Sequence, residues 1–554
     1  MLTSLVRTAL RIRLSRPETT LVPLLLALCL ARGLWFAGGL PVPTDADTVR
    51  DIGFIQGVVD GNWFGDPAIA GAWRWYPPLI HWLAGLGFRL GALLGGGDVL
   101  SAWPRMGLWL NLAVPVTFLA MNRALFGAGP AMAATAVLVL FNGGVMAADE
   151  TVGYTPWTLT PALAWPFFFL AVMALHRHVP ALRFAGAIAI GVLLGLVFLA
   201  HTVPALLLSG IAAAMVLATA GPTPRALAWV AVAGGVTLLV GMPFLGPLLL
   251  DYRLHIANPV PGAWVHPLLA APDGLGRLLA LNLPGVLAMA SVWHMRQHLP
   301  HHAAFPALAA WIVLCIVFLV RHYACQIAPG IGDACRVFVI APHHFHVYLQ
   351  AAWASLIGLS LSLAYRHGTG GLRALLATGG AIVALLGTVC VLSHQRDADA
   401  RAEALAHPDQ ILDRSAYAWI LRHTVPADRF VTLLPPEPDR MGSAAATVMA
   451  AGRVLVAPPE IHANPYVPWA PLNAHRLAWL DALSGGPEPC EPDGATTFAL
   501  LPSGFEVTAP SAAIAVRSAH HVLYRIYAPA CPPQGSGEGG EHFFDRLHLV
   551  AGGG

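Results

Sequence analysis

The segment DADTVRD, residues 45–51, directly follows the first long hydrophobic stretch of the chain. The segment WRWYPPL, residues 73–79, comes later in the same predicted loop. Carboxylates close to a membrane are costly unless they take part in chemistry or bind cations. These two segments therefore indicate a membrane protein with a functional acidic loop, in which Asp47 or Asp45 is the expected catalytic base.

The composition is that of a polytopic membrane protein. Of the 554 residues, 56% are hydrophobic and only 11% are charged, and the mean hydropathy is +0.64. A soluble domain typically has about 25% charged residues. The formal net charge of +2 offers no concentrated basic surface, so the composition argues against a nucleic-acid partner.

Hydropathy predicts about eleven membrane-spanning helices, because a spanning helix needs roughly 20 predominantly apolar residues. The candidate segments are 20–40, 104–122, 130–148, 156–175, 184–200, 204–220, 226–248, 275–293, 304–321, 347–365 and 372–392.

The distribution of arginine predicts how these helices are oriented. Four arginines and no acid precede Glu18, so the positive-inside rule places the N-terminus in the cytoplasm. An odd number of spans then places the C-terminal region on the extracytoplasmic side. We therefore divide the chain into a transmembrane domain, residues 1–392, whose first extracytoplasmic loop is 41–103, and an extracytoplasmic domain, residues 393–554.

The C-terminal region has the pattern of a small α/β domain. Strand-like runs at 430–434, 453–456 and 521–527 and a helical stretch at 472–484 are separated by Gly and Pro turns. The stretch 459–466 could face an acceptor, although a structural loop is the favoured interpretation.

Two pairs of acids are predicted on the extracytoplasmic side. Asp45 and Asp47 lie in the first loop, and Asp149 and Glu150 follow the third span. Paired carboxylates there can deprotonate a hydroxyl, balance an oxocarbenium-like centre, or hold a divalent cation such as Mg²⁺ or Mn²⁺ through oxygen ligands. For Asp45 and Asp51, helix capping or solvation is the alternative.

Residues 77–95 are apolar, but we expect them to form an interfacial helix rather than to cross the membrane. The Pro-Pro start suits a helix N-terminus, and His81 and Arg89 interrupt the apolar surface, as in a helix that lies among lipid headgroups. If this segment crossed, the two acidic pairs would fall on opposite sides of the membrane.

Basic side chains are predicted at the outer ends of the later spans. Arg321, Arg336, His343, His344 and His346 flank the tenth predicted span. Arginine offers a charged fork of donors suited to a lipid phosphate, so these residues are candidates for binding a donor phosphate. A metal site is an alternative, although no Glu-containing His motif accompanies the histidines. Anchoring at the membrane interface is another.

Four further side chains are expected to line the substrate site: Trp75, Tyr76, Tyr154 and His201. For His201, a hydrogen-bonded turn residue is the alternative. Arg32 lies in the last turns of the first span, where it would help to hold a phosphate or extend to the interface.

Four of the seven cysteines are predicted on the outer side. Cys325 and Cys335 bracket one loop, whereas Cys490 and Cys531 lie in the C-terminal domain. Two disulfides fit an oxidising compartment. A pair of free thiols is the alternative for Cys325 and Cys335.

The chain resembles the GT-C glycosyltransferases, which include protein O-mannosyltransferases, oligosaccharyltransferases and lipid A aminoarabinose transferases. The resemblance is carried by the acids after the first helix, Gly-Asn-Trp at 61–63, Asp66-Pro67, Tyr-Pro-Pro-Leu at 76–79 and the second acidic site after the third span. It covers residues 1–180 best.

The resemblance implies transfer of a sugar from a polyprenyl-phosphate carrier to a glycan, lipid or protein acceptor. The transfer would be an inverting displacement on the outer face of a bacterial-type inner (plasma) membrane. The essential acid would be Asp47 or Asp45, and the second acidic site Asp149 and Glu150. We favour Asp47, because Asp-Thr followed by a helical run recurs in related sequences. Tyr76 stands where aminoarabinose transferases carry a lysine, which argues against that specificity.

A multi-spanning transporter or flippase of a lipid-linked or small polar substrate is the alternative function. Such proteins commonly show internal repeats or buried charges in unwound mid-membrane segments. The sequence has no convincing repeat, and its acids cluster outside the predicted spans.

Overall fold

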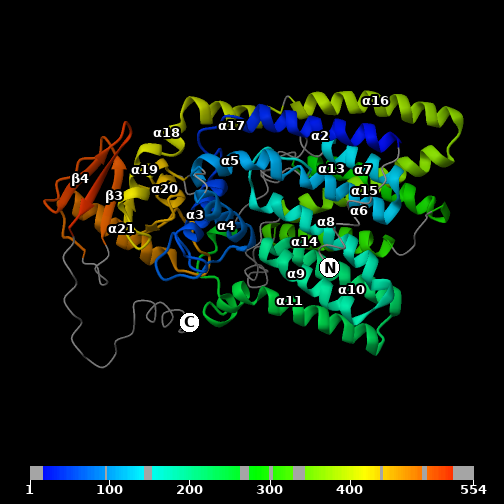
Figure 1. Cartoon of the computed structure of the whole chain (residues 1–554), viewed down its shortest axis with the longest axis horizontal. Helices are drawn as coiled ribbons and strands as arrows, with labels where there is room; N and C mark the ends of the chain where they lie inside the picture. Colours follow the sequence, from blue (N-terminus) through cyan, green and yellow to red (C-terminus); the bar gives the residue numbers. More distant parts are fainter. Residues whose placement is uncertain are drawn as a thin grey trace.

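The computed structural model describes residues 16–93, 97–141, 153–262, 274–298, 304–327, 343–392, 394–436, 441–489 and 496–527. Within these ranges the chain forms a bundle of helices at one end and a small α/β domain at the other (Figure 1). The expected fold class, a helical bundle with a small C-terminal sheet, is confirmed.

The helices of the bundle and its loops have the following bounds: α2 Arg16–Ala37, α3 Ala46–Val59, α4 Leu79–Ala92, α5 Val99–Leu110, α6 Ala113–Phe126, α7 Ala128–Phe141, α8 Thr160–His178, α9 Phe184–Ala200, α10 Thr202–Ala220, α11 Pro224–Leu250, α13 Gly274–His294, α14 Phe305–Ile327, α15 His343–His367 and α16 Gly370–Leu392.

Each segment expected to span the membrane corresponds to a helix in this bundle, except that 104–122 falls on α5 and α6 together. In the described part of the chain, seven helices are long and apolar enough to cross a membrane: Thr19–Ala37, Val99–Phe126, Thr160–Ala181, Thr202–Ala220, Pro224–Leu250, His344–His367 and Gly370–Val389. Three shorter apolar helices match further expected spans, and α13 matches the remaining one. The exact number of crossings stays a prediction.

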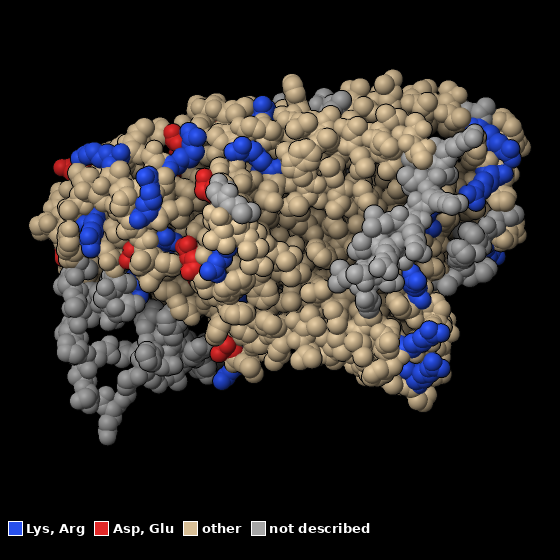
Figure 2. Space-filling model, viewed as in Figure 1, with Lys and Arg blue, Asp and Glu red and all other residues tan. Residues whose placement is uncertain are grey.

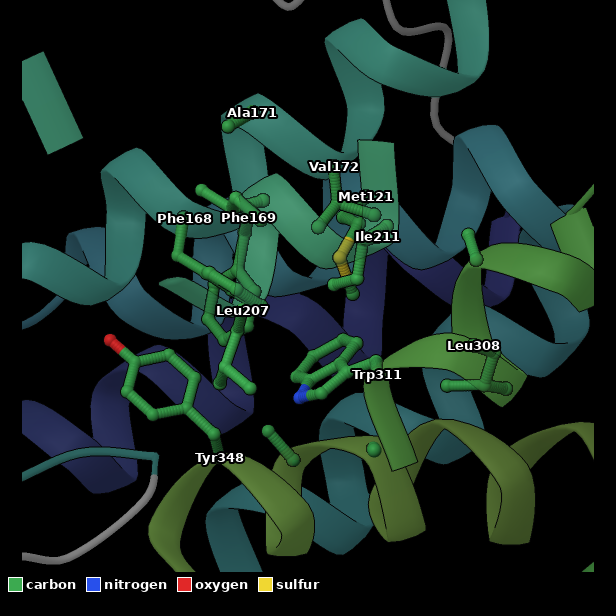
Figure 3. Close-up of a cluster of buried hydrophobic side chains, with 14 of the residues drawn as sticks. Met121, Phe168, Phe169, Ala171, Val172, Leu207, Ile211, Leu308, Trp311 and Tyr348 are labelled. Atoms are coloured by element: carbon green, nitrogen blue, oxygen red, sulfur yellow. The ribbon is translucent and has the colours of Figure 1, made fainter. Parts of the chain in front are cut away.

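The centre of the bundle is packed with aromatic rings from α8, α14 and α15 (Figure 3). The ring centroid of Phe168 lies 4.7 Å from that of Trp311 and 4.8 Å from that of Tyr348. Trp165 stacks on Tyr348 at 3.9 Å. Aromatic side chains bury large areas and prefer edge-to-face or offset contacts, so this cluster fixes how the three helices pack.

The outer surface of the bundle is apolar. Leu239 on α11 is 74% exposed and Leu375 on α16 is 68% exposed. Figure 2 shows a broad stretch of bundle surface without charged side chains, between the C-terminal domain and the charged opposite end. Apolar surfaces of this extent are unusual on soluble monomers, so this one is suited to contact with lipid.

Helix α4 has the form expected of an interfacial helix. It has 14 residues, which corresponds to about 21 Å and is short for a bilayer core. Leu83, Leu86 and Leu90 are exposed, and their spacing places them along one stripe. The expectation that His81 interrupts this surface is wrong, because His81 is fully buried.

The elements of the C-terminal domain are α17 Gln395–Ala406, α18 Pro408–Ile411, α19 Arg414–His423, β1 Arg429–Thr432, α20 Ser443–Ala450, β2 Val454–Leu455, α21 Trp469–Leu483, β3 Thr497–Pro502, β4 Ala512–Arg517 and β5 His521–Ile526. The three strand-like runs and the helical stretch expected from the sequence correspond to β1, β2, β5 and α21.

The sheet of this domain has the strand order β2-β1-β3-β5-β4. Strands β2, β1 and β3 are parallel, whereas β5 pairs antiparallel with β3 and β4. Phe430 and Phe498 pack in one cluster with α19, α20 and α3, and Val431 and Ala499 pack in another with Trp479 of α21. The two crossover helices therefore cover opposite faces of the sheet.

Helix α3 of the first loop joins the bundle to the C-terminal domain by packing directly on α20. The contact is so close that a Cβ at Gly53 would lie 2.1 Å from the carbonyl oxygen of Met449. The Arg453 guanidinium adds an ion pair at 2.6 Å to Asp60, the residue that ends α3. The loop and the domain thus form one packed unit.

We predict that Gly53→Ala destabilises this unit by about 1–3 kcal/mol, the usual cost of overpacking. The matched control is Gly87→Ala on exposed α4, where an added Cβ meets no atom within 4 Å. Thermal unfolding of the two variants in detergent measures the difference. Equal stability of both variants would contradict the described packing of α3 on α20.

Candidate active site

The carboxylate of Asp51 is the buried centre of the first loop. Its side chain is fully buried, and it accepts hydrogen bonds from Arg50 at 3.3 Å and from His81 Nε2 at 3.1 Å. Its second oxygen accepts from the hydroxyl of Thr160, the first residue of α8. Asp51 therefore ties α3 and α4 to the start of a candidate membrane span.

The charges around Asp51 are balanced. Burial alone would raise the pKa of the Asp51 carboxyl, but Arg50 and the hydrogen bond from His81 outweigh it, and the pKa is lowered. Burial lowers the pKa of His81. At neutral pH an ionised Asp51 therefore accepts a hydrogen bond from a neutral His81, and neither capping nor solvation describes Asp51.

Asp47 differs from Asp51 in being open to solvent. Its side chain is 53% exposed, and one carboxylate oxygen lies 2.7 Å from Nη1 of the buried Arg50 guanidinium. Arg50 also stacks over the ring of Tyr76, with 4.3 Å from Cζ to the ring centroid. Because Arg50 is held by Asp51 and Tyr76, Asp47 has a fixed direction and one oxygen available to a ligand.

Asp45 is the cap of α3. One of its oxygens accepts the backbone N–H of Thr48 and the other accepts the Thr48 hydroxyl, both at 2.7 Å. Burial and the neighbouring charge of Asp47 raise the pKa of Asp45 to about 6. The structure therefore separates the two predicted acids into a capping carboxylate and an exposed one.

An aromatic path leads from Arg50 to the ends of later helices. The ring centroid of Tyr76 lies 6.3 Å from that of His201, and His201 lies 4.7 Å from His344. His201 forms the junction between α9 and α10, and His344 lies in the first turn of α15. Tyr76 and His201, which were expected at the substrate site, and His344, which was expected at the donor phosphate, therefore lie in one series of ring contacts.

The stretch 459–466 of the C-terminal domain also reaches this site. His462 Nδ1 lies 4.0 Å from a carboxylate oxygen of Asp47, and burial lowers the pKa of His462 to about 4. The buried amide of Asn464 donates to the carbonyl of Trp73 at 3.0 Å and approaches the Tyr252 hydroxyl at 3.3 Å. Structural anchoring of this stretch was expected, but the approach of His462 to Asp47 was missed.

Other predicted residues lie in different surroundings. Arg32 is buried and forms an ion pair at 2.6 Å with Asp397 of α17, so its charge is already balanced. Tyr154 is buried, and its hydroxyl donates to the carbonyl of Leu108 at 2.9 Å.

The remaining described candidates are Trp75, His346 and Arg321. The half-buried ring of Trp75 contacts Tyr76 edge-on at 5.6 Å. His346 is buried, with Nε2 at 3.3 Å from the amide nitrogen of Gln350 on the same helix. Arg321 is half-buried on α14. Of these three, only Trp75 belongs to the aromatic path at Asp47.

Several predicted residues lie outside the described part of the chain: Asp149, Glu150, Arg336, Cys335, Cys490 and Cys531, together with the side chains of His343 and Cys325.

The structure nevertheless describes the segment that follows Asp149 and Glu150, from residue 153 onward. The side-chain amide of Asn111 donates to the carbonyls of Thr155 and Trp157, both at 2.8 Å, and Thr160 bonds to Asp51. This segment therefore lies at the same end of the bundle as α3, which is the arrangement that the two acidic pairs require.

A cation held between the two acidic pairs stays a prediction, because Asp149 and Glu150 lie outside the described residues. Both oxygens of Asp45 are engaged by Thr48, and Asp47 is paired with Arg50. Across the described ranges, no group of three or more His, Cys, Asp or Glu side chains is arranged to hold a metal ion.

A separate cavity lies between the first loop and the C-terminal domain. It has a volume of about 340 Å³ and is lined by Gly57, Asn62, Asp66, Arg429 and Val454, among others. Gly57 is ten residues along α3 from Asp47, which corresponds to about 15 Å. This cavity is therefore too distant to hold a group that reacts at Asp47.

The similarity of this chain to known proteins is found in its fold and not in its sequence. No protein-family model matches the sequence, and a search of curated proteins finds no significant match.

Three solved structures share the fold. ArnT from Cupriavidus metallidurans bound to undecaprenyl phosphate has a TM-score of 0.54 and 14% identity, and the match covers 92% of this chain and 99% of that one. The oligosaccharyltransferase AglB from Archaeoglobus fulgidus, in complex with an inhibitory peptide and a dolichol-phosphate, has a TM-score of 0.52 and 14% identity over 80% and 65%. The arabinofuranosyltransferase AftD from Mycobacteria has a TM-score of 0.50 and 13% identity over 93% and 42%. All three are GT-C glycosyltransferases, and the chain has their fold.

We predict that Asp51→Ala costs about 3–5 kcal/mol, because it leaves the buried Arg50 without one of its partners. The matched control is Asp98→Ala, which removes an exposed cap of α5 and costs about 1 kcal/mol. Unfolding in detergent compares the two variants. A loss of stability at Asp51 no larger than at Asp98 would show that the buried contacts of Asp51 are not required.

Proposed function

We propose that this chain, which has the GT-C fold, is a glycosyltransferase that moves a sugar from a polyprenyl-phosphate carrier to an acceptor hydroxyl on a glycan, lipid or protein. The fold supports the general class. The carrier lipid is supported by the undecaprenyl phosphate bound to ArnT and by the dolichol-phosphate bound to AglB.

The observation that carries the proposal is the exposed carboxylate of Asp47. It lies where the first loop, the end of the bundle and the C-terminal domain meet, with Arg50 and His462 beside it. An acceptor hydroxyl is a poor nucleophile at neutral pH, and a carboxylate within hydrogen-bond reach accelerates its attack by taking the proton. Asp47 has the exposure and the fixed direction for this role.

The proposed reaction is a single displacement. Asp47 accepts the proton of the acceptor hydroxyl as its oxygen bonds to the anomeric carbon of the sugar. The bond between that carbon and the carrier phosphate breaks on the opposite face, and the polyprenyl phosphate leaves with the electron pair. Attack from the face opposite the leaving group inverts the anomeric centre.

The donor phosphate is proposed to bind at the far end of the aromatic path. His344 and His201 lie there beside Tyr76, and the predicted phosphate ligands Arg321, Arg336 and His343 belong to the same helix ends or the segment between them. Arg32 and His346 are left out of the proposed donor site, because both contact other partners inside the protein.

The orientation in the membrane is part of the proposal. In the face shown in Figure 2, described acidic side chains gather at the end that carries the C-terminal domain, whereas the opposite end shows only basic ones. Arginine-rich loops favour the cytoplasmic side. This distribution supports a multi-pass protein with its active site and C-terminal domain outside, and we propose that the membrane is a bacterial-type inner membrane.

We predict that Asp47→Asn lowers the rate of sugar transfer by about 10²–10⁴, the usual effect of losing a general base. The variant should still fold and bind carrier lipid, because Asp47 is exposed. Asp98→Asn, a change in an exposed cap of α5, is the matched control and should keep its activity. Single-turnover transfer from a polyprenyl-phosphate sugar measures both, and full activity of Asp47→Asn would end the assignment.

We also predict that the transfer rate rises as pH increases through about 6. The raised pKa of Asp45 means that this carboxyl loses its proton in that range, and the carboxylate then adds a negative charge that can balance an oxocarbenium-like centre beside Asp47. The Asp45→Asn variant should lack this rise. The measurement is the transfer rate as a function of pH for the wild type and for Asp45→Asn. If the variant shows the same inflection near pH 6 as the wild type, Asp45 is not the group that causes the inflection.

A further inference from the structure

Three side chains of the C-terminal domain form a series of hydrogen bonds. Ser443 Oγ lies 3.1 Å from His521 Nε2, and His521 Nδ1 lies 3.0 Å from a carboxylate oxygen of Asp413. Ser443 is the first residue of α20, His521 is the first residue of β5, and Asp413 caps α19. The proposed sugar transfer uses none of these residues.

The carboxylate determines which way the hydrogen bonds run. Hydrogen bonds from His521, from the backbone N–H of Ala416 and from the Ser518 hydroxyl lower the pKa of Asp413 to about 2, although burial opposes them. An ionised carboxylate only accepts hydrogen bonds, so His521 Nδ1 must carry the proton. In the neutral ring Nε2 then accepts, and the Ser443 hydroxyl donates to it.

The supporting contacts hold this arrangement rigidly. Asp413 is fixed by Ser518 and by the N–H of Ala416 at 3.0 Å, and its own N–H donates to the Thr447 hydroxyl at 2.9 Å. The same hydroxyl donates to the carbonyl of Ser443 at 2.7 Å. The aspartate and the serine are therefore positioned by one shared contact.

Ser443 lies at a position beside the sheet where ligands commonly bind in folds of this type. In an open α/β sheet, ligands bind at the carboxyl ends of the parallel strands. They bind at the point where one crossover connection runs toward one side of the sheet and the next runs toward the other side. Here the chain passes from β1 through α20 to β2 on one side, and then through α21 to β3 on the other. Ser443 begins the first crossover helix, and His521 pairs with Pro502 at the end of β3.

The half-buried hydroxyl of Ser443 is also close to donors for a negative charge. The first N–H groups of an α-helix have no partner within the helix. Such groups can stabilise an oxyanion when they face the position that it occupies. The nucleophile, the base and the group that orients the base are thus gathered in one hydrogen-bonded series at the N-terminus of α20.

We propose that Ser443, His521 and Asp413 form a second catalytic site, which cleaves carboxylic esters. Ser443 Oγ bonds to the acyl carbon while its proton passes to His521 Nε2. The acyl–oxygen bond then breaks, and the leaving alcohol takes that proton. Water then bonds to the acyl carbon while its proton passes to His521, the bond between that carbon and Ser443 Oγ breaks to release the acid, and His521 returns the proton to Ser443. The net reaction is ester plus water to acid plus alcohol.

The test uses the full chain in detergent and a fluorophosphonate probe. Reaction would form an Oγ–phosphorus bond at Ser443 as the phosphorus–fluorine bond breaks, with the serine proton passing to His521. Peptide mass spectrometry of the wild-type protein should locate the adduct on Ser443. Ser443→Ala should abolish labelling, and His521→Gln should slow it by about 10²–10⁴, the range for a lost general base.

The control distinguishes reactivity from accessibility. Ser503 lies at the same sheet edge and is exposed, so Ser503→Ala should label as fast as the wild type. A purely structural network predicts no adduct on Ser443 of the folded wild-type protein, and that result alone would overturn the proposal, whatever the stability of the variants. Equal labelling of Ser443 and Ser503 would overturn it as well.

Discussion

The buried carboxylate of Asp51 is the interaction on which the site depends. One negative charge in a fully buried position must be compensated, and here Arg50, His81 and Thr160 do so from three helices. Removal of any one of them would leave polar atoms buried without a partner. The first loop, the interfacial helix α4 and the start of α8 are therefore held in one arrangement by a single charge.

The proposed chemistry follows from that arrangement. Arg50 can hold Asp47 because its guanidinium is itself held by Asp51 and stacked on Tyr76. Asp47 remains exposed at the N-terminal end of α3, while the other end of α3 is ion-paired to the C-terminal domain through Asp60 and Arg453. The exposed acid lies outside the candidate membrane spans, as the proposed transfer requires.

The sequence could predict those features that depend on neighbouring residues. Apolar runs indicate the helices, the acids after the first run indicate the candidate reactive loop, and strand-like runs between Gly and Pro turns predict the strands of the C-terminal domain. Contacts between distant residues could not be predicted. Asp47 and His462 are 415 residues apart, and Arg32 and Asp397 are 365 apart. His81 was expected at a surface, because a histidine in an amphipathic helix gives no sign that a buried acid is its partner.

The central claim is that Asp47, held by Arg50, faces the donor across the ring of Tyr76. A structure with a bound polyprenyl phosphate tests this claim most directly. We expect the phosphate beside His344 and His201, with its ester oxygen facing a space bordered by Asp47. A phosphate bound elsewhere in the bundle, with Asp47 shielded from it by protein, would contradict the account.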